Sequence, residues 1–123
     1  MILVDTGVWI DHLHASEPML ARELGADEVV CHPAVIEELA LGSMRSRGDV
    51  LRLLSELRSV PVLDHHELMT FVEAERLWGR GLSAIDAHLL GACRVIPGVR
   101  LWTRDKRLKA AAAEVGVAAV TWR

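Results

Sequence analysis

The chain has 123 residues with a formal net charge of −3 at pH 7, and 51% of its residues are hydrophobic. This length suits one domain with a substantial core, and the apolar content excludes an intrinsically disordered chain. The charge argues against a general nucleic-acid coat protein, but it permits an enzyme that binds nucleic acid locally through a metal ion and a few arginines.

Strand and helix signals alternate along the chain. The apolar run at 2–4 predicts a strand, the amphipathic stretch at 7–14 a helix, and residues 17–25, with Pro18 early and Gly25 at the end, a second helix. Further strands are predicted at 28–32, 60–63, 100–103 and 117–121, and further helices at 33–42, 45–59, 66–78, 83–95 and 105–115. Pro61 cannot donate to a sheet ladder, so its strand is placed at an edge. The alternation predicts an α/β fold with a mostly parallel five-stranded sheet between two helical layers.

No feature of the sequence indicates export or membrane insertion. No apolar run approaches the roughly 20 residues of a membrane span. The N-terminus has no basic stretch before its apolar residues, so no signal peptide is expected. Cys31 and Cys93 form no CxxC pair and are expected to be buried thiols. We therefore expect a cytoplasmic protein with no membrane partner.

Two predicted strands end on an aspartate. The run at 2–4 leads directly into Asp5, and residues 99–103 lead through Arg104 into Asp105. Open α/β sheets hold their sites at the carboxyl ends of strands. Either aspartate alone is explained as a helix N-cap. Two on strands that could be neighbours favour a carboxylate-lined pocket, which a divalent cation would stabilise.

Two further acidic positions are ambiguous from spacing alone. Glu37 and Glu38 are adjacent on a predicted helix, and helical periodicity does not choose between a site residue and a solvated pair. Asp86 follows Ser83 by three residues, which matches a capping box, although that box prefers Glu or Gln at the third position. The histidines do not indicate a metal site, because His12 and His14 fall on different helix faces and His32 and His88 are expected to be peripheral.

Four segments in order resemble the PIN-domain ribonucleases, and within them the VapC-type toxins of bacterial toxin–antitoxin pairs. These segments are residues 4–11, 38–42, 85–92 and 101–105. In the family they carry the four acids of a metal site, which correspond here to Asp5, Glu38, Asp86 and Asp105. The resemblance therefore selects Glu38 over Glu37.

The resemblance implies a single PIN-like nuclease domain over residues 1–123. It implies a metal-dependent endoribonuclease that is restrained by a cognate antitoxin and forms a homodimer. Oxygen ligands suit Mg²⁺ or Mn²⁺ better than Zn²⁺, whose sites favour Cys and His. Thr6, Thr103 and Arg104 are predicted to support the metal ligands or to contact a phosphate.

The sequence departs from the family pattern at two positions. Gly7 stands where a Ser or Asn is common, and Leu108 stands where an aromatic residue is common. Several cations surround Asp105 and are candidates for phosphate contacts or for a solvated helix face: Arg100, Arg104, Lys106, Arg107 and Lys109.

A second function class stays open. A non-catalytic, doubly wound α/β binding domain or receiver-like regulatory domain would use Asp5 and Asp105 as caps or regulatory acids. A receiver would place a phosphorylated acid after a middle strand, where Asp64 stands, and a lysine after a later strand. The two lysines, Lys106 and Lys109, both lie in the last predicted helix.

Overall fold

The structure is a computed structural model, and it describes residues 1–121. The strands in this part of the chain are β1 (Ile2–Val4), β2 (Val29–Cys31), β3 (Arg58–Ser59) and β4 (Arg100–Trp102). The helices are α1 (Thr6–His14), α2 (Pro18–Gly25), α3 (Pro33–Ala40), α4 (Arg47–Glu56), α5 (His65–Glu75), α6 (Ala84–Val95) and α7 (Lys106–Glu114).

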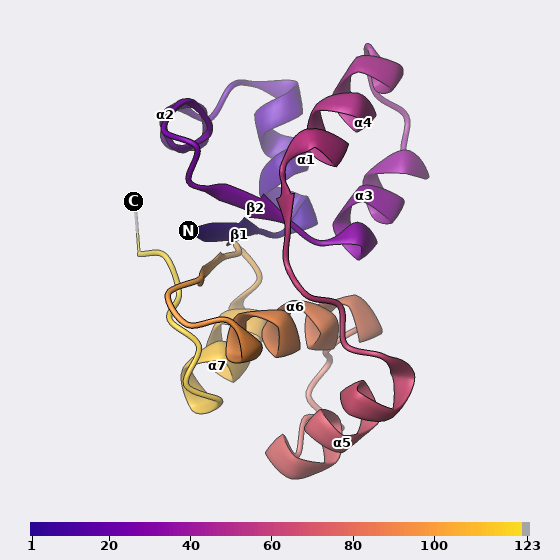
Figure 1. Cartoon of the computed structure of the whole chain (residues 1–123), viewed down its shortest axis with the longest axis vertical. Coiled ribbons are helices and arrows are strands. Elements are labelled where there is room, and N and C mark those ends of the chain that lie inside the picture. Colours follow the sequence, from indigo (N-terminus) through magenta and orange to yellow (C-terminus); the bar gives the residue numbers. More distant parts are fainter. Residues whose placement is uncertain (122–123) are drawn as a thin grey trace.

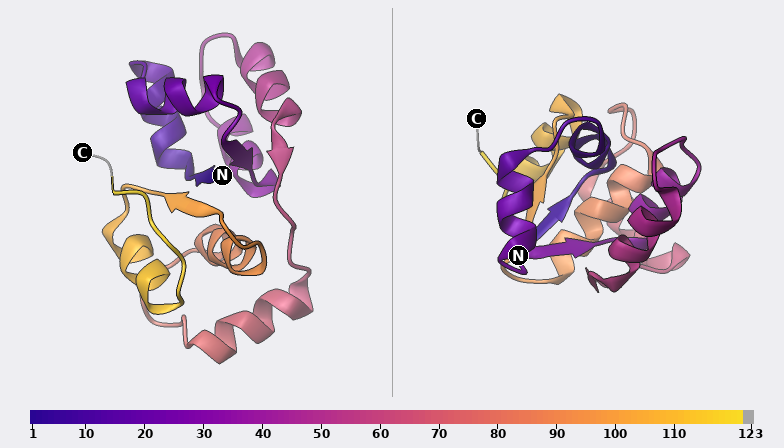
Figure 2. Two further views of the ribbon diagram at one scale, coloured as in Figure 1. Left: turned by 60° about the vertical axis from the view of Figure 1, so that its left-hand side comes forward. Right: turned by 90° about the horizontal axis from the view of Figure 1, so that it is seen from above.

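The sheet has the order β3-β2-β1-β4, and its neighbouring strands are all parallel (Figure 1). Helices α1–α4 lie on one side of the sheet, and α6 and α7 lie on the other, with α5 packed against the outside of α6 (Figures 1 and 2). The central strand β1 is apolar along its whole length and fully buried, as expected for a parallel strand covered on both faces. The α/β fold with three layers is therefore confirmed.

The sheet has four strands in the part of the chain that the structure describes, so the predicted count of five is wrong. Within residues 1–121, the predicted fifth strand at 117–121 meets β4 at Leu101, which forms an isolated parallel bridge with Ala119. Two hydrogen bonds of 2.8 Å join Leu101 to the backbone of Ala118 and Val120. Val117 and Val120 in this segment are instead buried as core residues.

The strand predicted at 60–63 is β3, two residues earlier. Its edge position is as predicted, since it pairs only with β2. The backbone N–H of Val60 still donates to the carbonyl of Cys31 at 3.0 Å. Pro61 follows and has no N–H to continue the ladder, so pairing stops there.

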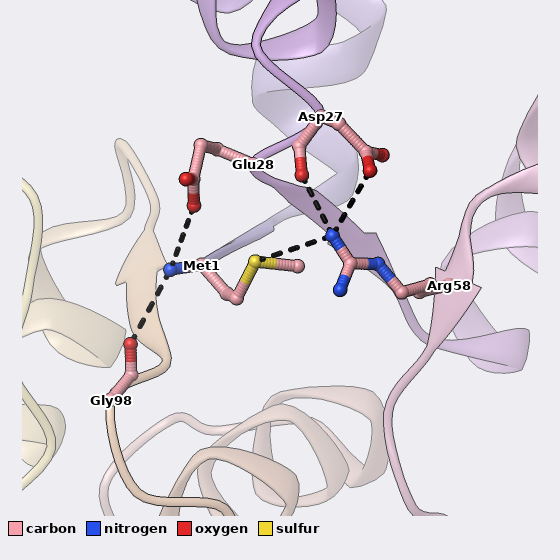
Figure 3. Close-up of polar contacts among 5 residues, drawn as sticks. All are labelled: Met1, Asp27, Glu28, Arg58 and Gly98. Atoms are coloured by element: carbon pink, nitrogen blue, oxygen red, sulfur yellow. Dashed lines mark hydrogen bonds and ion pairs between the residues drawn. The ribbon is translucent and has the colours of Figure 1, made fainter.

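The amino edge of the sheet is held by polar contacts between its strands (Figure 3). The amino group of Met1 pairs with the carboxylate of Glu28 at 3.3 Å and donates to the carbonyl of Gly98 at 3.5 Å. Arg58 donates to the carbonyl of Asp27 at 2.8 Å and pairs with its carboxylate at 3.2 Å. At this edge the acids are matched by cations.

No helix within residues 1–121 is both long and apolar enough to span a lipid bilayer. The longest, α6, has 12 residues, whereas a span needs roughly 20.

Candidate active site

The carboxyl ends of β1 and β4 lie side by side in the sheet. The helices that follow them, α1 and α7, leave toward opposite faces (Figure 2). Open α/β sheets hold their ligands at the carboxyl edge where the connections of neighbouring strands diverge in this way, and we call this place the crevice. Asp5 follows β1 and Thr103 follows β4, so the chain delivers both side chains to this crevice.

Asp5 is fixed at both carboxylate oxygens. It is the N-cap of α1, and its Oδ1 accepts from the backbone N–H of Thr6 at 2.8 Å. Its Oδ2 accepts from the hydroxyl of Thr103 at 2.7 Å. The N-cap interpretation of Asp5 is therefore right, but capping uses only one of the two oxygens.

The electrostatics of Asp5 set it apart from an ordinary cap. Burial raises its pKa above the usual range, and the negative charges of Asp86 and Glu38 raise it further. The hydrogen bonds from Thr103 and Thr6 act in the opposite direction but do not cancel the rise. Across residues 1–121, none of the four predicted site acids has an Arg or Lys partner within ion-pair distance. The crevice thus holds negative charge without a compensating cation.

Glu38 reaches the crevice from α3. Its Oε1 accepts from the hydroxyl of Thr6, a buried residue, at 2.5 Å. Glu37 makes no side-chain contact of this kind within the part of the chain that the structure describes. The structure thus places Glu38, and not Glu37, beside the residue that follows Asp5.

Asp86 begins α6 in a reciprocal capping box with Ser83. Its backbone N–H donates to the Ser83 hydroxyl at 3.1 Å, and its Oδ2 accepts from the Ser83 N–H at 2.9 Å. The capping interpretation is therefore confirmed. The same carboxylate contributes to the raised pKa of Asp5, so it caps the helix and also adds charge to the crevice.

Asp105 is joined to Asp5 through one hydroxyl. It is the N-cap of α7, and its Oδ1 accepts from the N–H groups of Arg107 and Leu108 at 2.9 and 3.3 Å. Its own backbone N–H donates to the Thr103 hydroxyl at 3.1 Å. Thr103, whose exposed fraction is only 2%, therefore accepts from Asp105 and donates to Asp5.

The four acids share one edge of the sheet, but they do not form a compact cage. Within residues 1–121, no three His, Cys, Asp or Glu side chains lie close enough together to hold a metal ion as they stand. One oxygen each of Asp86 and Asp105 is used for capping. The donors are nevertheless all oxygens without a counter-charge, a set that fits Mg²⁺ or Mn²⁺, and Mg²⁺ usually keeps several of its waters.

His32, which was expected to be peripheral to any metal site, is a buried residue of the core. Its exposed fraction is 2%, and its Nδ1 accepts from the backbone N–H of Ala34 at 2.9 Å, so it caps α3. Burial, with a smaller effect of His88 at a ring distance of 5.5 Å, lowers the pKa of His32 to about 4. A histidine directly before Pro33 at a helix start gives no sequence sign of this burial.

Cys31 and Cys93 are buried free thiols, as predicted. Burial raises their pKa values to about 11 and about 12, so neither is a thiolate at neutral pH.

Arg104 does not project freely toward the crevice. Its guanidinium forms ion pairs with Asp11 of α1 and with Glu17, the N-cap of α2. Sequence reasoning missed both contacts, because the two acids lie 93 and 87 positions away from Arg104 in the chain.

The Thr103 bridge leads to a testable expectation. Thr103→Val should lower the free energy of unfolding by about 1–3 kcal/mol, because it removes a donor from a half-buried carboxylate. It should also raise the pKa of Asp5 further, since the Thr103 bond lowers that pKa. Denaturant unfolding and an NMR titration of the Asp5 carboxyl would measure both effects. Thr70→Val, on the exposed surface of α5, is the matched control, and an Asp5 pKa unchanged by Thr103→Val would contradict the bridge.

Comparison with known proteins agrees with this geometry. The family model of the PIN domain matches residues 2–114. Two curated relatives, both named Ribonuclease VapC32 and from Mycobacterium tuberculosis strains CDC 1551 / Oshkosh and ATCC 25618 / H37Rv, are each 60% identical to this chain over 118 residues. Each match covers 96% of this chain and 95% of the relative. The chain therefore belongs to the PIN-domain family, as a VapC-type member.

Proposed function

We propose that this protein is a divalent-metal-dependent endoribonuclease and the toxin component of a type II toxin–antitoxin pair. The observation that carries the proposal is the group of Asp5, Glu38 and Asp86, which no Arg or Lys compensates within residues 1–121, beside the carboxyl ends of the paired strands β1 and β4. The ribonuclease name of relatives 60% identical over almost the whole chain supports it.

Four residues would hold Mg²⁺ or Mn²⁺: Asp5, Glu38, Asp86 and Asp105. When bound, the ion would supply Lewis-acid chemistry, lowering the pKa of a water molecule and polarising an RNA phosphodiester. Thr103 and Thr6 hold the carboxylates of Asp5 and Glu38 in place. One carboxylate would orient the attacking water for in-line hydrolysis, leaving a 5′-phosphate and a 3′-hydroxyl.

The cations of α7 are candidates for RNA contacts. Lys106 and Lys109 are exposed on the helix that Asp105 caps. Phosphate contacts of this kind position a nucleic acid without reading its sequence. The net charge of −3 then fits local binding rather than coating of the nucleic acid.

The receiver-like alternative receives no support from the same positions. Asp64, the acid after β3, is engaged in a capping box with Glu67 at the start of α5. The two lysines lie on the outer surface of α7. No observation favours a regulatory phosphorylation site over a nuclease.

An apolar groove beside Glu38 is the proposed binding site of the antitoxin. It encloses about 820 Å³ between α1 and the turn from α3 to α4. Its lining residues are Ile10, Leu13, His14, Glu38, Leu39, Gly42, Ser43, Met44 and Arg45. Leu41, 90% exposed on the same turn, adds apolar surface for a partner helix. We propose that an antitoxin segment lies here, that the toxin is a homodimer, and that the pair acts in the cytoplasm.

The proposal is tested by incubating the purified protein with total RNA and mapping the ends of the fragments. We expect discrete cuts with 5′-phosphate and 3′-hydroxyl ends that appear only when Mg²⁺ or Mn²⁺ is present. Cuts with 2′,3′-cyclic phosphate ends would contradict the proposed hydrolysis, since those ends arise when the ribose hydroxyl attacks instead of water.

A further inference from the structure

Arg104 lies in the chain between Thr103 and the site acid Asp105. Thr103, directly before it, touches both Asp5 and the backbone of Asp105, which directly follows it. We propose that Arg104 is a positioning residue, whose ion pairs with Asp11 and Glu17 hold the turn between β4 and α7 against α1 and α2. This inference rests on the proposed ribonuclease function, because it assigns a residue to that site.

The two acids that hold Arg104 come from different helical segments. Asp11 lies on α1, the helix that Asp5 caps, and pairs with one guanidinium nitrogen. Glu17 pairs with the other guanidinium nitrogen at 2.9 Å. A guanidinium presents its donors in a fixed planar fork, so two simultaneous partners restrict its orientation.

Glu17 is also held by contacts that do not involve Arg104. Its Oε1 accepts from the backbone N–H of Met19 at 3.3 Å as the N-cap of α2. Its own backbone N–H donates to Nδ1 of His12 at 2.9 Å. The acceptor is therefore fixed by the fold, which distinguishes this pair from a casual contact between two mobile surface chains.

The charges around Arg104 argue against a direct phosphate contact. One guanidinium faces two carboxylates, so a phosphate that approaches it meets an excess of negative charge. Lys106, two residues on, is exposed and has no ion-pair partner among residues 1–121. Arg104 therefore positions the turn between β4 and α7, whereas Lys106 is available to contact RNA.

The turn that Arg104 holds carries the bridge between Asp5 and Asp105. Loss of the Arg104 side chain should let Thr103 move relative to Asp5, although all four site acids and Thr103 would still be present. Displacement of a catalytic constellation by about 1 Å costs on the order of a hundredfold in rate. A positioning role thus predicts a loss of turnover without a loss of RNA affinity.

The test compares Arg104→Met with the double variant Asp11→Asn, Glu17→Gln. Glu17→Gln keeps a side-chain oxygen for the cap of α2. Each should lower kcat on a single-site RNA by about tenfold to a hundredfold, with KM and the RNA dissociation constant in EDTA within about twofold of wild type. Combining all three changes should cost no more than Arg104→Met alone, because the residues act as one unit. Arg52→Gln, which breaks the exposed pair with Asp49 on α4, is the control and should leave kcat unchanged.

A phosphate contact would give the opposite pattern. Arg104→Met would then weaken RNA binding and reduce its salt slope by about 1, and the double variant would strengthen binding by releasing Arg104. That result would overturn the proposal. Rates are expressed per folded molecule, with the folded fraction measured by near-UV circular dichroism.

A measurement without RNA separates this inference from the proposed function. The amide N–H of Asp105, bonded to Thr103, should exchange with solvent at least about tenfold faster in Arg104→Met and in the double variant, but not in Arg52→Gln. Unchanged exchange would overturn the positioning role even in an active ribonuclease. Faster exchange in a protein that cleaves no RNA would reject the proposed function and leave the structural role of Arg104 intact.

Discussion

Asp5→Asn should reduce RNA cleavage to about one hundredth of wild type or less, and it should leave the melting temperature unchanged or raised. The substitution removes a proposed ligand of the metal ion, and the loss of one group that contributes to transition-state stabilisation typically costs about a hundredfold to a thousandfold. The amide can still accept from Thr6, so the cap of α1 survives. The substitution also removes a half-buried charge that Asp86 and Glu38 repel.

The sign of the stability effect follows from the raised pKa of Asp5. In EDTA, the folded protein binds a proton at Asp5 more tightly than the unfolded chain does, because the folded pKa lies above the ordinary value of 3.8. Stability therefore falls as pH rises from that ordinary value through the folded pKa, and the deficit persists at neutral pH. Asp5→Asn should remove this pH dependence, as measured by denaturant unfolding across that range.

Asp64→Asn is the matched control for Asp5→Asn. Asp64 is also an N-cap aspartate, at the start of α5, but it is exposed and bound within its own capping box. The same chemical change there should alter neither cleavage nor the pH dependence of stability. If Asp5→Asn unfolds the protein while cleavage per folded molecule stays at the wild-type rate, Asp5 is only a structural cap.

Saturating Mg²⁺ or Mn²⁺ should stabilise the wild-type fold by about 2–3 kcal/mol at a hundredfold excess over the dissociation constant. The physical reason is that the crevice holds negative charge that no Arg or Lys neutralises within residues 1–121. Zn²⁺ should substitute poorly, because the expected ligands are all carboxylates. Thermal or denaturant unfolding with and without each metal measures the effect.

The stabilisation should vanish in an Asp5→Asn, Asp105→Asn double variant. An Asp49→Asn, Asp64→Asn variant changes the net charge equally at exposed positions, on α4 and at the N-cap of α5, so it controls for general cation binding. Equal stabilisation of both double variants by Mn²⁺ would place the metal elsewhere.

The parts of the fold that could be predicted are those that depend on residues close together in the sequence. The apolar run that ends at Asp5 specifies a buried strand and a helix cap together. Pro61 predicted an edge strand, and β3, which ends two residues before this proline, is at the edge. The fifth strand was wrong because the apolar residues at 117–120 indicate burial equally well as strand pairing. Pattern alone does not say how many backbone bonds a segment will make.

The site itself depends on contacts that no local pattern records. Helical spacing could not separate Glu38 from Glu37, and only a hydroxyl 32 positions away, on Thr6, marks the difference in the structure. The resemblance to a family supplied that choice in advance. The pairing of Arg104 with Asp11 was unpredictable in the same way, since the two residues meet only after the strands have assembled.

The most direct test of the metal-dependent site is cleavage of one RNA by wild type and Asp5→Asn, purified side by side, in EDTA and after Mn²⁺ is added back. We predict cleavage in a single condition, wild type with Mn²⁺, with 5′-phosphate ends. Undiminished cleavage in excess EDTA by a preparation free of contaminating nuclease, or equal cleavage by folded Asp5→Asn, would contradict it.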